Sequence, residues 1–159
     1  MKFVFFLRFD LKPLPFTNST GWKYPLHLTT GSSSEKIPMV YHLSKLPILR
    51  VQYTGGGFNT YYDYKELDRS KWTQIEISQK KVGSPSRYIY SVKIDNDEKV
   101  TKFNDKAKEF FDVKVYSSIP LYPAEGSIRN MLINPEGKTI DPFTEYLRGQ
   151  VFEFRRVKK

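Results

Sequence analysis

The sequence contains no cysteine, only two histidines and no long hydrophobic run. Without cysteine, the chain has no disulfide, no thiolate nucleophile and no sulfur-bound zinc site. No apolar stretch approaches the ~18 residues that a membrane-spanning helix needs. The apolar run at residues 3–7 ends at Arg8, whereas the core of a signal peptide has roughly 7–15 apolar residues. We therefore expect residues 3–7 to begin the first β-strand rather than to act as a signal peptide.

Patterns typical of helices are also scarce. Residues 105–110 and 142–148 are each long enough for a single turn, and the second has Pro142 at its first position and Gly149 after its end, as helices often do. Ten prolines and nine glycines are spread along the chain, which is typical of a protein with many turns. Because the 159 residues contain no linker or repeat, we expect a single domain over residues 1–159.

Short runs of alternating apolar and polar residues cover most of the chain. In residues 72–79, Thr73, Ile75 and Ile77 share one face of a predicted strand. Residues 87–94 and 99–103 form a predicted hairpin around the polar turn at residues 95–98. Further strands are predicted at residues 111–116, 127–133, 151–157 and, more weakly, 3–10, 22–30, 37–43, 48–53 and 58–64. So many short strands predict an all-β protein with an antiparallel two-sheet jelly-roll sandwich.

Four segments in order carry a family resemblance: residues 72–79 (WTQIEISQ), 88–95 (YIYSVKID), 111–118 (FDVKVYSS) and 123–130 (PAEGSIRN). Together with Gly21-Trp22 and residues 26–31, they resemble the laminin-G-like members of the concanavalin A-like lectin/glucanase superfamily over about residues 3–134. The resemblance implies a jelly roll in an extracellular or secreted protein. Ser127 stands where laminin-G domains usually have a cysteine.

Residues 135–159 form a C-terminal extension without a counterpart in that family. The alternation in residues 151–157 predicts a closing strand there. Because jelly rolls commonly bring their ends together, we expect this strand to pair with the first one.

Residues for catalysis are largely missing. Glycoside hydrolases of this superfamily carry a Glu-x-Asp-x-x-Glu pattern on one strand, because retaining hydrolysis needs two carboxyl groups ~5–5.5 Å apart. Glu76 is followed by Ile-Ser-Gln and has no such partner. No Gly-x-Ser-x-Gly motif accompanies His27 or His42. We therefore expect a protein that is not an enzyme, and a divergent glycoside hydrolase acting through Glu76 is the least favoured alternative.

Oxygen ligands for calcium are clustered at Asp95, Asn96 and Asp97. The same residues suit a hairpin turn, because Asp and Asn tolerate left-handed backbone conformations. They lack the glycine and distal glutamate of an EF-hand loop. We expect the turn and no cofactor. Laminin-G-like domains often bind calcium at one rim, so the resemblance leaves calcium open and the metal ligands unassigned.

Aromatic residues flank the glycines at residues 55–57, namely Tyr53, Phe58, Tyr61, Tyr62 and Tyr64. Rings stack on the apolar faces of sugars, and glycines allow a ligand to approach the backbone closely. The candidate ligand-binding residues are Tyr53, Tyr61, Tyr62 and the basic Arg129. Alternatively, the glycines form a turn and the aromatic residues belong to the core.

The formal net charge is +9, which favours an acidic partner or simply keeps the domain soluble. Lys93 and Lys114 lie opposite the apolar side of their strands, so one outer sheet face is expected to be positive. No nucleic-acid-binding motif is present, and nucleic acid is not the expected partner. The sequon Asn18-Ser19-Thr20 matters only if the chain is secreted.

These features together favour a lectin-like or adhesion module that binds carbohydrate, anionic glycans included. The second interpretation is a protein–protein interaction domain that docks an acidic protein surface and has no sugar site.

Overall fold

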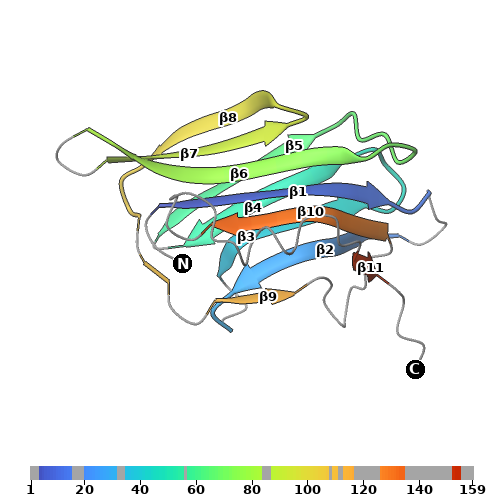
Figure 1. Ribbon diagram of the computed structural model, residues 1–159, viewed down its shortest axis with the longest axis horizontal. Helices are drawn as coiled ribbons and strands as arrows, with labels where there is room; N and C mark the ends of the chain where they lie inside the picture. Colours follow the sequence, from blue (N-terminus) through green and yellow to red (C-terminus); the bar gives the residue numbers. More distant parts are fainter. Residues whose placement is uncertain are drawn as a thin grey trace.

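The computed structural model describes residues 4–15, 20–31, 35–55, 57–83, 87–107, 109–110, 113–116, 126–134 and 152–154. Within them, eleven β-strands form two antiparallel sheets that pack face to face (Figure 1). No helix in this part of the chain is long and apolar enough to cross a membrane. The prediction of an all-β, antiparallel two-sheet sandwich is confirmed.

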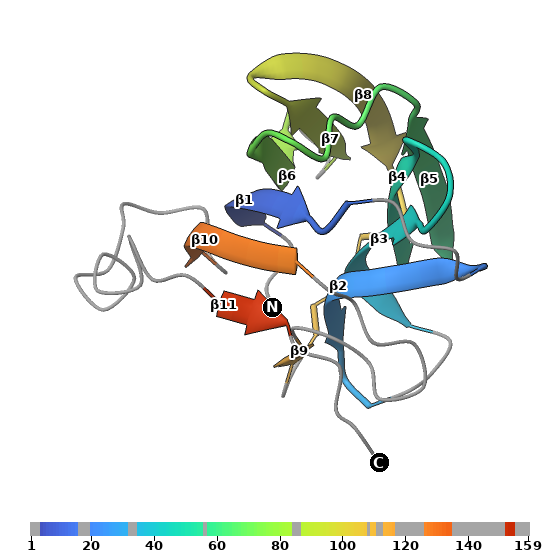
Figure 2. The same ribbon diagram turned by 90° about the vertical axis from the view of Figure 1, so that its right-hand side faces the viewer.

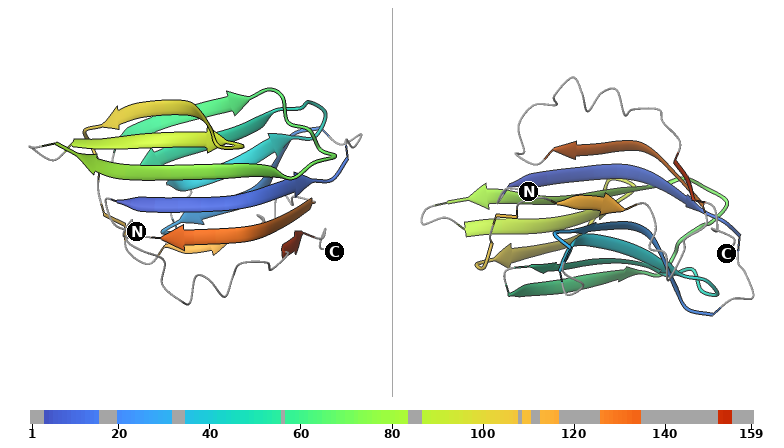
Figure 3. Two further views of the ribbon diagram at one scale, coloured as in Figure 1. Left: turned by 45° about the horizontal axis from the view of Figure 1, so that its top comes forward. Right: turned by 90° about the horizontal axis from the view of Figure 1, so that it is seen from below.

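The six-stranded sheet contains, in spatial order, β11 (Phe152–Phe154), β10 (Gly126–Asn134), β1 (Phe5–Pro13), β6 (Thr73–Val82), β7 (Arg87–Ile94) and β8 (Asp97–Asn104). The five-stranded sheet contains β5 (Phe58–Tyr64), β4 (Leu49–Gly55), β3 (Lys36–Leu43), β2 (Trp22–Thr29) and β9 (Lys114–Tyr116). Figure 2 shows the two sheets nearly end-on, and the left view of Figure 3 looks onto the six-stranded one.

The core lies between the sheets because successive side chains of a strand point to opposite faces. In the six-stranded sheet, Leu7 is aligned with Ile77 and Phe9 with Ile75. In the five-stranded sheet, Val40 lies between Leu26 and Val51 in the same cross-strand row. All seven side chains are fully buried, and burying each contributes roughly 1.5–3 kcal/mol to stability.

The β7–β8 hairpin turns at Asp95 and Asn96, whose φ angles are +51° and +67°. Positive φ at both central residues is what a two-residue type I′ turn requires. The Asp95 side chain also accepts a hydrogen bond from the Gln74 backbone N–H at 2.8 Å. The predicted turn is therefore present, although Asp97 already belongs to β8.

One prediction about the chain's later segments is wrong. The closing strand β11 pairs with β10 and not with β1, because β10 and β6 already occupy both edges of β1. In residues 105–110, which are long enough for one helical turn, Asp105 and Lys106 form a hydrogen-bonded turn. The Asn104 side chain accepts from the Lys106 N–H there at 3.0 Å. Residues 142–148 and the sequon at residues 18–20, apart from Thr20, lie outside the described residues.

The strand predicted at residues 111–116 is shorter than expected. Residues 114–116 form β9, an edge strand of the five-stranded sheet. Val115 is 43% exposed, because the edge position leaves one side of β9 without a neighbouring strand. The alternating pattern alone therefore overestimated how much of this segment is buried.

The buried Arg69 ties three loops together at one end of the sandwich. Its guanidinium donates to the backbone carbonyls of Leu14 at 3.1 Å, of Leu43, and of Leu46 at 3.4 Å. Beside it, Nδ1 of the buried His42 lies 3.3 Å from Arg69 Nη2. Backbone carbonyls at the ends of β1 and β3 and in the loop after β3 thus accept from the terminal nitrogens of this buried cation, which lies in the loop before β6.

Candidate functional site

Aromatic and charged side chains gather on the outer face of the five-stranded sheet. This outer-face cluster contains Trp22 and Tyr24 of β2, Tyr41 of β3, Arg50 of β4, and Tyr61 and Asp63 of β5. Alternation places it there: Val40 and Val51 point into the core, so Tyr41 and Arg50 point outward. The strand register aligns Arg50 with both Tyr41 and Asp63.

Arg50 is the centre of the cluster. Its guanidinium carbon lies 4.7 Å from the centroid of the Trp22 ring and 4.5 Å from that of the Tyr61 ring. Nε and Nη2 donate to the two carboxylate oxygens of Asp63 at 2.5 and 2.6 Å. This bidentate pair fixes the guanidinium plane, and the hydrogen bonds to Asp63 raise the pKa of Arg50 above its ordinary value.

Tyr41 forms the buried floor of the cluster. The Trp22 ring meets it edge-on at 4.8 Å, and the Tyr24 ring stacks on it at 5.1 Å. Its hydroxyl donates to Gln52 Oε1 at 2.6 Å, and Lys36 Nζ donates to the same oxygen at 3.0 Å. Burial raises the pKa of Tyr41, so the phenol remains a neutral hydrogen-bond donor.

The upper part of the cluster is open to solvent. Tyr61 is 57% exposed, Trp22 is half-buried, and the side chains of Arg50 and Asp63 are 26% and 24% exposed. The cluster thus presents ring faces next to fixed hydrogen-bond donors and acceptors. Flat apolar surface beside oriented polar groups can hold a ligand that has both C–H faces and hydroxyl groups.

The tyrosines selected from the sequence occupy three different environments. Tyr61 belongs to the outer-face cluster. Tyr62 is aligned with Val51 and therefore points toward the core side of β5, where it is half-buried. Tyr53 is 1% exposed and stacks on Phe5 in the core, with ring centroids 6.0 Å apart. The prediction that Tyr53 contacts a ligand is therefore wrong, and the core alternative holds for it.

Arg129 lies on the outer face of the other sheet. Its Nε is 3.1 Å from Asp10 Oδ2, and its guanidinium carbon lies 4.1 Å from the Trp72 ring centroid. Asn130 also donates to Asp10 Oδ2, at 2.7 Å. The structure therefore does not bring Arg129 together with Tyr61, and Arg129 already has a carboxylate partner.

The predicted positive face is not formed. Lys93 and Lys114 belong to different sheets, because β7 lies in the six-stranded sheet and β9 in the five-stranded one. Lys93 Nζ is 3.2 Å from Glu76 Oε1, and Glu76 is also aligned with Arg8 of β1. Cations and carboxylates thus alternate across this row of the six-stranded sheet, and both cross-strand neighbours of Glu76 are cations.

The two histidines are mostly buried. Burial, together with the smaller effect of the Arg69 charge, lowers the pKa of His42 to about 4. Burial also lowers the pKa of His27, whose Nε2 lies 3.4 Å from the Glu35 carbonyl oxygen. Both rings are therefore neutral at pH 7. Among the described residues, no group of three or more His, Asp or Glu side chains is arranged to hold a metal ion.

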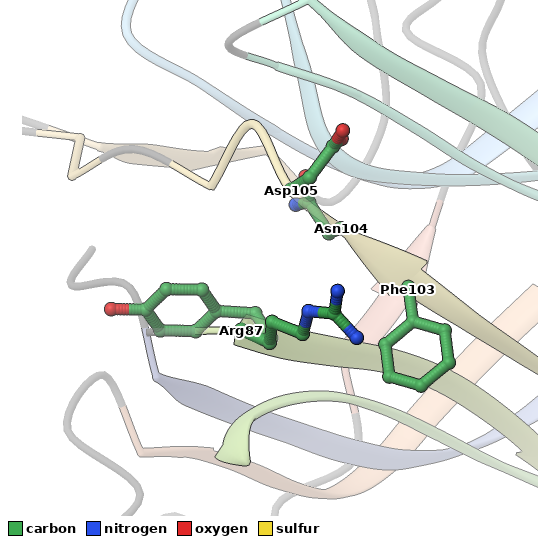
Figure 4. A pocket seen from close by; sticks show the side chains of 5 residues that line it. Arg87, Phe103, Asn104 and Asp105 are labelled. Carbon is green, nitrogen blue, oxygen red and sulfur yellow. The ribbon is translucent and has the colours of Figure 1, made fainter. Parts of the chain in front are cut away.

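A pocket of about 330 Å³ lies beside the outer edge of the six-stranded sheet, and sequence reasoning missed it. It is lined by Arg87 and Tyr88 of β7 and by Phe103, Asn104 and Asp105 at the end of β8. Figure 4 shows the Arg87 side chain extending toward the Phe103 ring, with 5.9 Å between the guanidinium carbon and the ring centroid. Phe103 is 64% exposed, because Lys102 and Asn104 take the inward positions of β8.

Sequence reasoning also missed Trp22, Arg50 and Asp63. The sequence contained part of the signal, because Arg50 lies between the apolar Leu49 and Val51 and so points away from the core. The contact between Arg50 and Asp63 depends on the register of β4 and β5, which the alternation does not determine.

Comparison of the sequence with models of protein families finds no match, and comparison with curated proteins finds no similar sequence. The two-sheet architecture is established by the structure, whereas membership of the laminin-G-like family stays a prediction.

Proposed function

We propose that this protein is a non-catalytic carbohydrate-binding module whose site is the outer-face cluster. The observation that carries the proposal is the arrangement of Trp22, Arg50 and Tyr61, in which two partly exposed rings flank a guanidinium held by Asp63. Rings offer surface to the C–H faces of a sugar, while Arg50 and Asp63 offer a donor and an acceptor to its hydroxyl groups. By resemblance to laminin-G-like modules, we place the protein outside the cell.

The cluster is organised before any ligand arrives. Asp63 holds Arg50 through two hydrogen bonds, and Tyr41 is locked beneath Trp22 and Tyr24. A ligand that binds there immobilises few additional side chains, so less of the interaction energy is lost to ordering. This favours useful affinity from a shallow site on a sheet face.

A glycan array that contains neutral and sulfated series tests the proposal, with binding measured at low and moderate salt. We expect Tyr61→Ala and Trp22→Ala to weaken binding about tenfold, which corresponds to about 1.4 kcal/mol. Phe103→Ala is the matched control, because it removes an exposed ring from the other sheet. Silence across the array, or unchanged binding by both variants, contradicts the proposal, and turnover of a glycan that Glu76→Gln abolishes would restore the hydrolase alternative.

A second candidate function is protein interaction, which the pocket at Phe103 favours. An exposed aromatic ring beside Arg87 suits a partner that presents an apolar side chain next to a carboxylate. Selection from a peptide display library tests it: the selected peptides should be acidic and should lose binding to Phe103→Ser but keep binding to Tyr61→Ala. Selected peptides that bind Phe103→Ser unchanged exclude this function.

A further inference from the structure

We propose, resting on the function proposed above, that Asp63 is a specificity-determining residue that makes the outer-face cluster select neutral glycans over anionic ones. The net charge of +9 favours an acidic ligand for the chain as a whole. The charge at the cluster itself is different, because its central cation is matched by a carboxylate at hydrogen-bond distance.

Asp63 makes Arg50 less able to bind an anion. The carboxylate accepts from Nε and Nη2, which are two of the five N–H donors of a guanidinium and form its best bidentate edge. A sulfate would have to use the remaining N–H groups while lying close to the Asp63 carboxylate. Because Coulomb energy falls only in inverse proportion to distance, the repulsion from Asp63 offsets most of the attraction to Arg50.

A neutral hydroxyl group is not repelled by the Asp63 carboxylate. It can accept a hydrogen bond from a free N–H of Arg50 and donate its own proton to a carboxylate oxygen of Asp63. A sulfate or carboxylate group of a ligand only accepts, so it cannot use Asp63 at all. The pair therefore fits the donor–acceptor character of an uncharged sugar.

The second cation near the cluster is also engaged. Lys36 Nζ donates to Gln52 Oε1 at 3.0 Å, and the same oxygen accepts from the Tyr41 hydroxyl. Lys36 therefore already has an acceptor in Gln52, the residue of β4 that is aligned with Tyr61. The half-buried Trp22 ring and the exposed Tyr61 ring lie beside the Arg50–Asp63 ion pair, which has no net charge. This combination suits an uncharged oligosaccharide.

The test compares matched glycans, with and without sulfate on the same backbone, together with a heparin hexasaccharide as the anionic probe. The wild type is expected to bind neutral members more tightly, and Tyr61→Ala is expected to reduce that binding. Asp63→Asn keeps the size of the side chain and one acceptor for Arg50. It should raise affinity for the heparin hexasaccharide about tenfold, and the gain should shrink as salt is added.

Two further variants make the result specific. Asp97→Asn removes the same charge from the edge strand β8 of the other sheet and should leave heparin binding nearly unchanged. Adding Arg50→Gln to Asp63→Asn should remove the gain, because it removes the cation that Asp63 had matched. Thermal melting of each variant confirms that it is folded.

The outcomes separate this inference from the proposed function. If neutral and sulfated glycans both bind at Tyr61 and Asp63→Asn does not improve heparin binding, the role of Asp63 is refuted and the proposed function stands. If the wild type binds sulfated members more tightly than neutral ones through Arg50, the inference is likewise overturned. If no glycan binds the wild type, the proposed function fails and the inference fails with it.

Discussion

The buried His42 should make the protein lose stability in mildly acidic solution. Its side chain is 3% exposed, and burial together with Arg69 lowers its pKa from 6.5 to about 4. As pH falls below 6.5, His42 of the unfolded chain binds a proton that His42 of the folded protein does not yet bind. The unfolded state is therefore stabilised relative to the folded state. The stabilising effect is complete above pH 6.5 and is lost progressively between pH 6.5 and pH 4.

The size of this loss follows from the two pKa values. The pKa difference between 6.5 in the unfolded chain and about 4 in the folded protein corresponds to a maximum stability loss of about 3 kcal/mol, at 1.36 kcal/mol for each pKa unit. At pH 5, where the unfolded histidine is protonated and the folded one is still mostly neutral, the linkage relation gives a loss of about 2 kcal/mol. This is a large fraction of the 5–15 kcal/mol that typically stabilises a domain.

Urea unfolding at pH 7, 6 and 5 measures this loss, and these values avoid most carboxylate titration. His42→Gln removes this titrating group, so it should lose about 2 kcal/mol less stability than the wild type between pH 7 and pH 5. Any remaining loss comes from His27, whose pKa burial also lowers. His27→Gln is the matched control, because it removes the other histidine and leaves the His42 contribution intact. The reasoning is refuted if the wild type and His42→Gln lose the same stability between pH 7 and pH 5.

Four substitutions test other parts of the structure. Replacing the buried Arg69 with Met leaves the carbonyls that accept from it without a donor. The free energy of unfolding should fall by about 3 kcal/mol. If urea unfolding shows the same stability as the wild type, this role of Arg69 is contradicted. Tyr53→Ala empties a core position and should lower the free energy of unfolding by about 3–5 kcal/mol. Tyr61→Ala at the surface should lower it by less than about 0.5 kcal/mol. Equal shifts of the two variants in thermal melting would refute the two assignments. Gly126→Ala places a Cβ 2.7 Å from the Lys12 carbonyl oxygen at φ +147° and should destabilise the β1–β10 pairing by about 2 kcal/mol, so a melting temperature equal to that of the wild type would contradict the packing there.

Local alternation was enough to predict most strands and several core residues. Ile75 and Ile77 alternate with polar residues and are fully buried, because a strand with one buried face must have this pattern. Alternation also predicts burial of Tyr53, because it lies on the same face of β4 as Leu49 and Val51, and all three are buried. The error came from treating proximity to the glycines as a sign of exposure.

The strand pairing and the composition of the candidate site depended on which strands become neighbours, which the local pattern does not determine. Residues 152–154 form a strand as expected, but their partner is β10, since topology and not local pattern decides which edge is free. The candidate site has the same limit. Tyr61 was identified as an isolated aromatic residue, but its contact with Arg50 joins β4 and β5, and the contact of Arg50 with Trp22 reaches two strands further to β2.

The two tryptophans allow the most direct test of the proposed site. Trp22 lies in the outer-face cluster, whereas Trp72 lies just before β6 of the other sheet, beside Arg129. The measurement is a two-dimensional ¹H–¹⁵N NMR titration of the protein with a neutral oligosaccharide that binds on the array. The indole signals are assigned with Trp22→Phe and Trp72→Phe. Sugar binding at the cluster predicts that the Trp22 indole signal shifts with ligand concentration and that the Trp72 signal stays in place. A shift of the Trp72 signal alone, or of neither signal while the ligand binds, would contradict it.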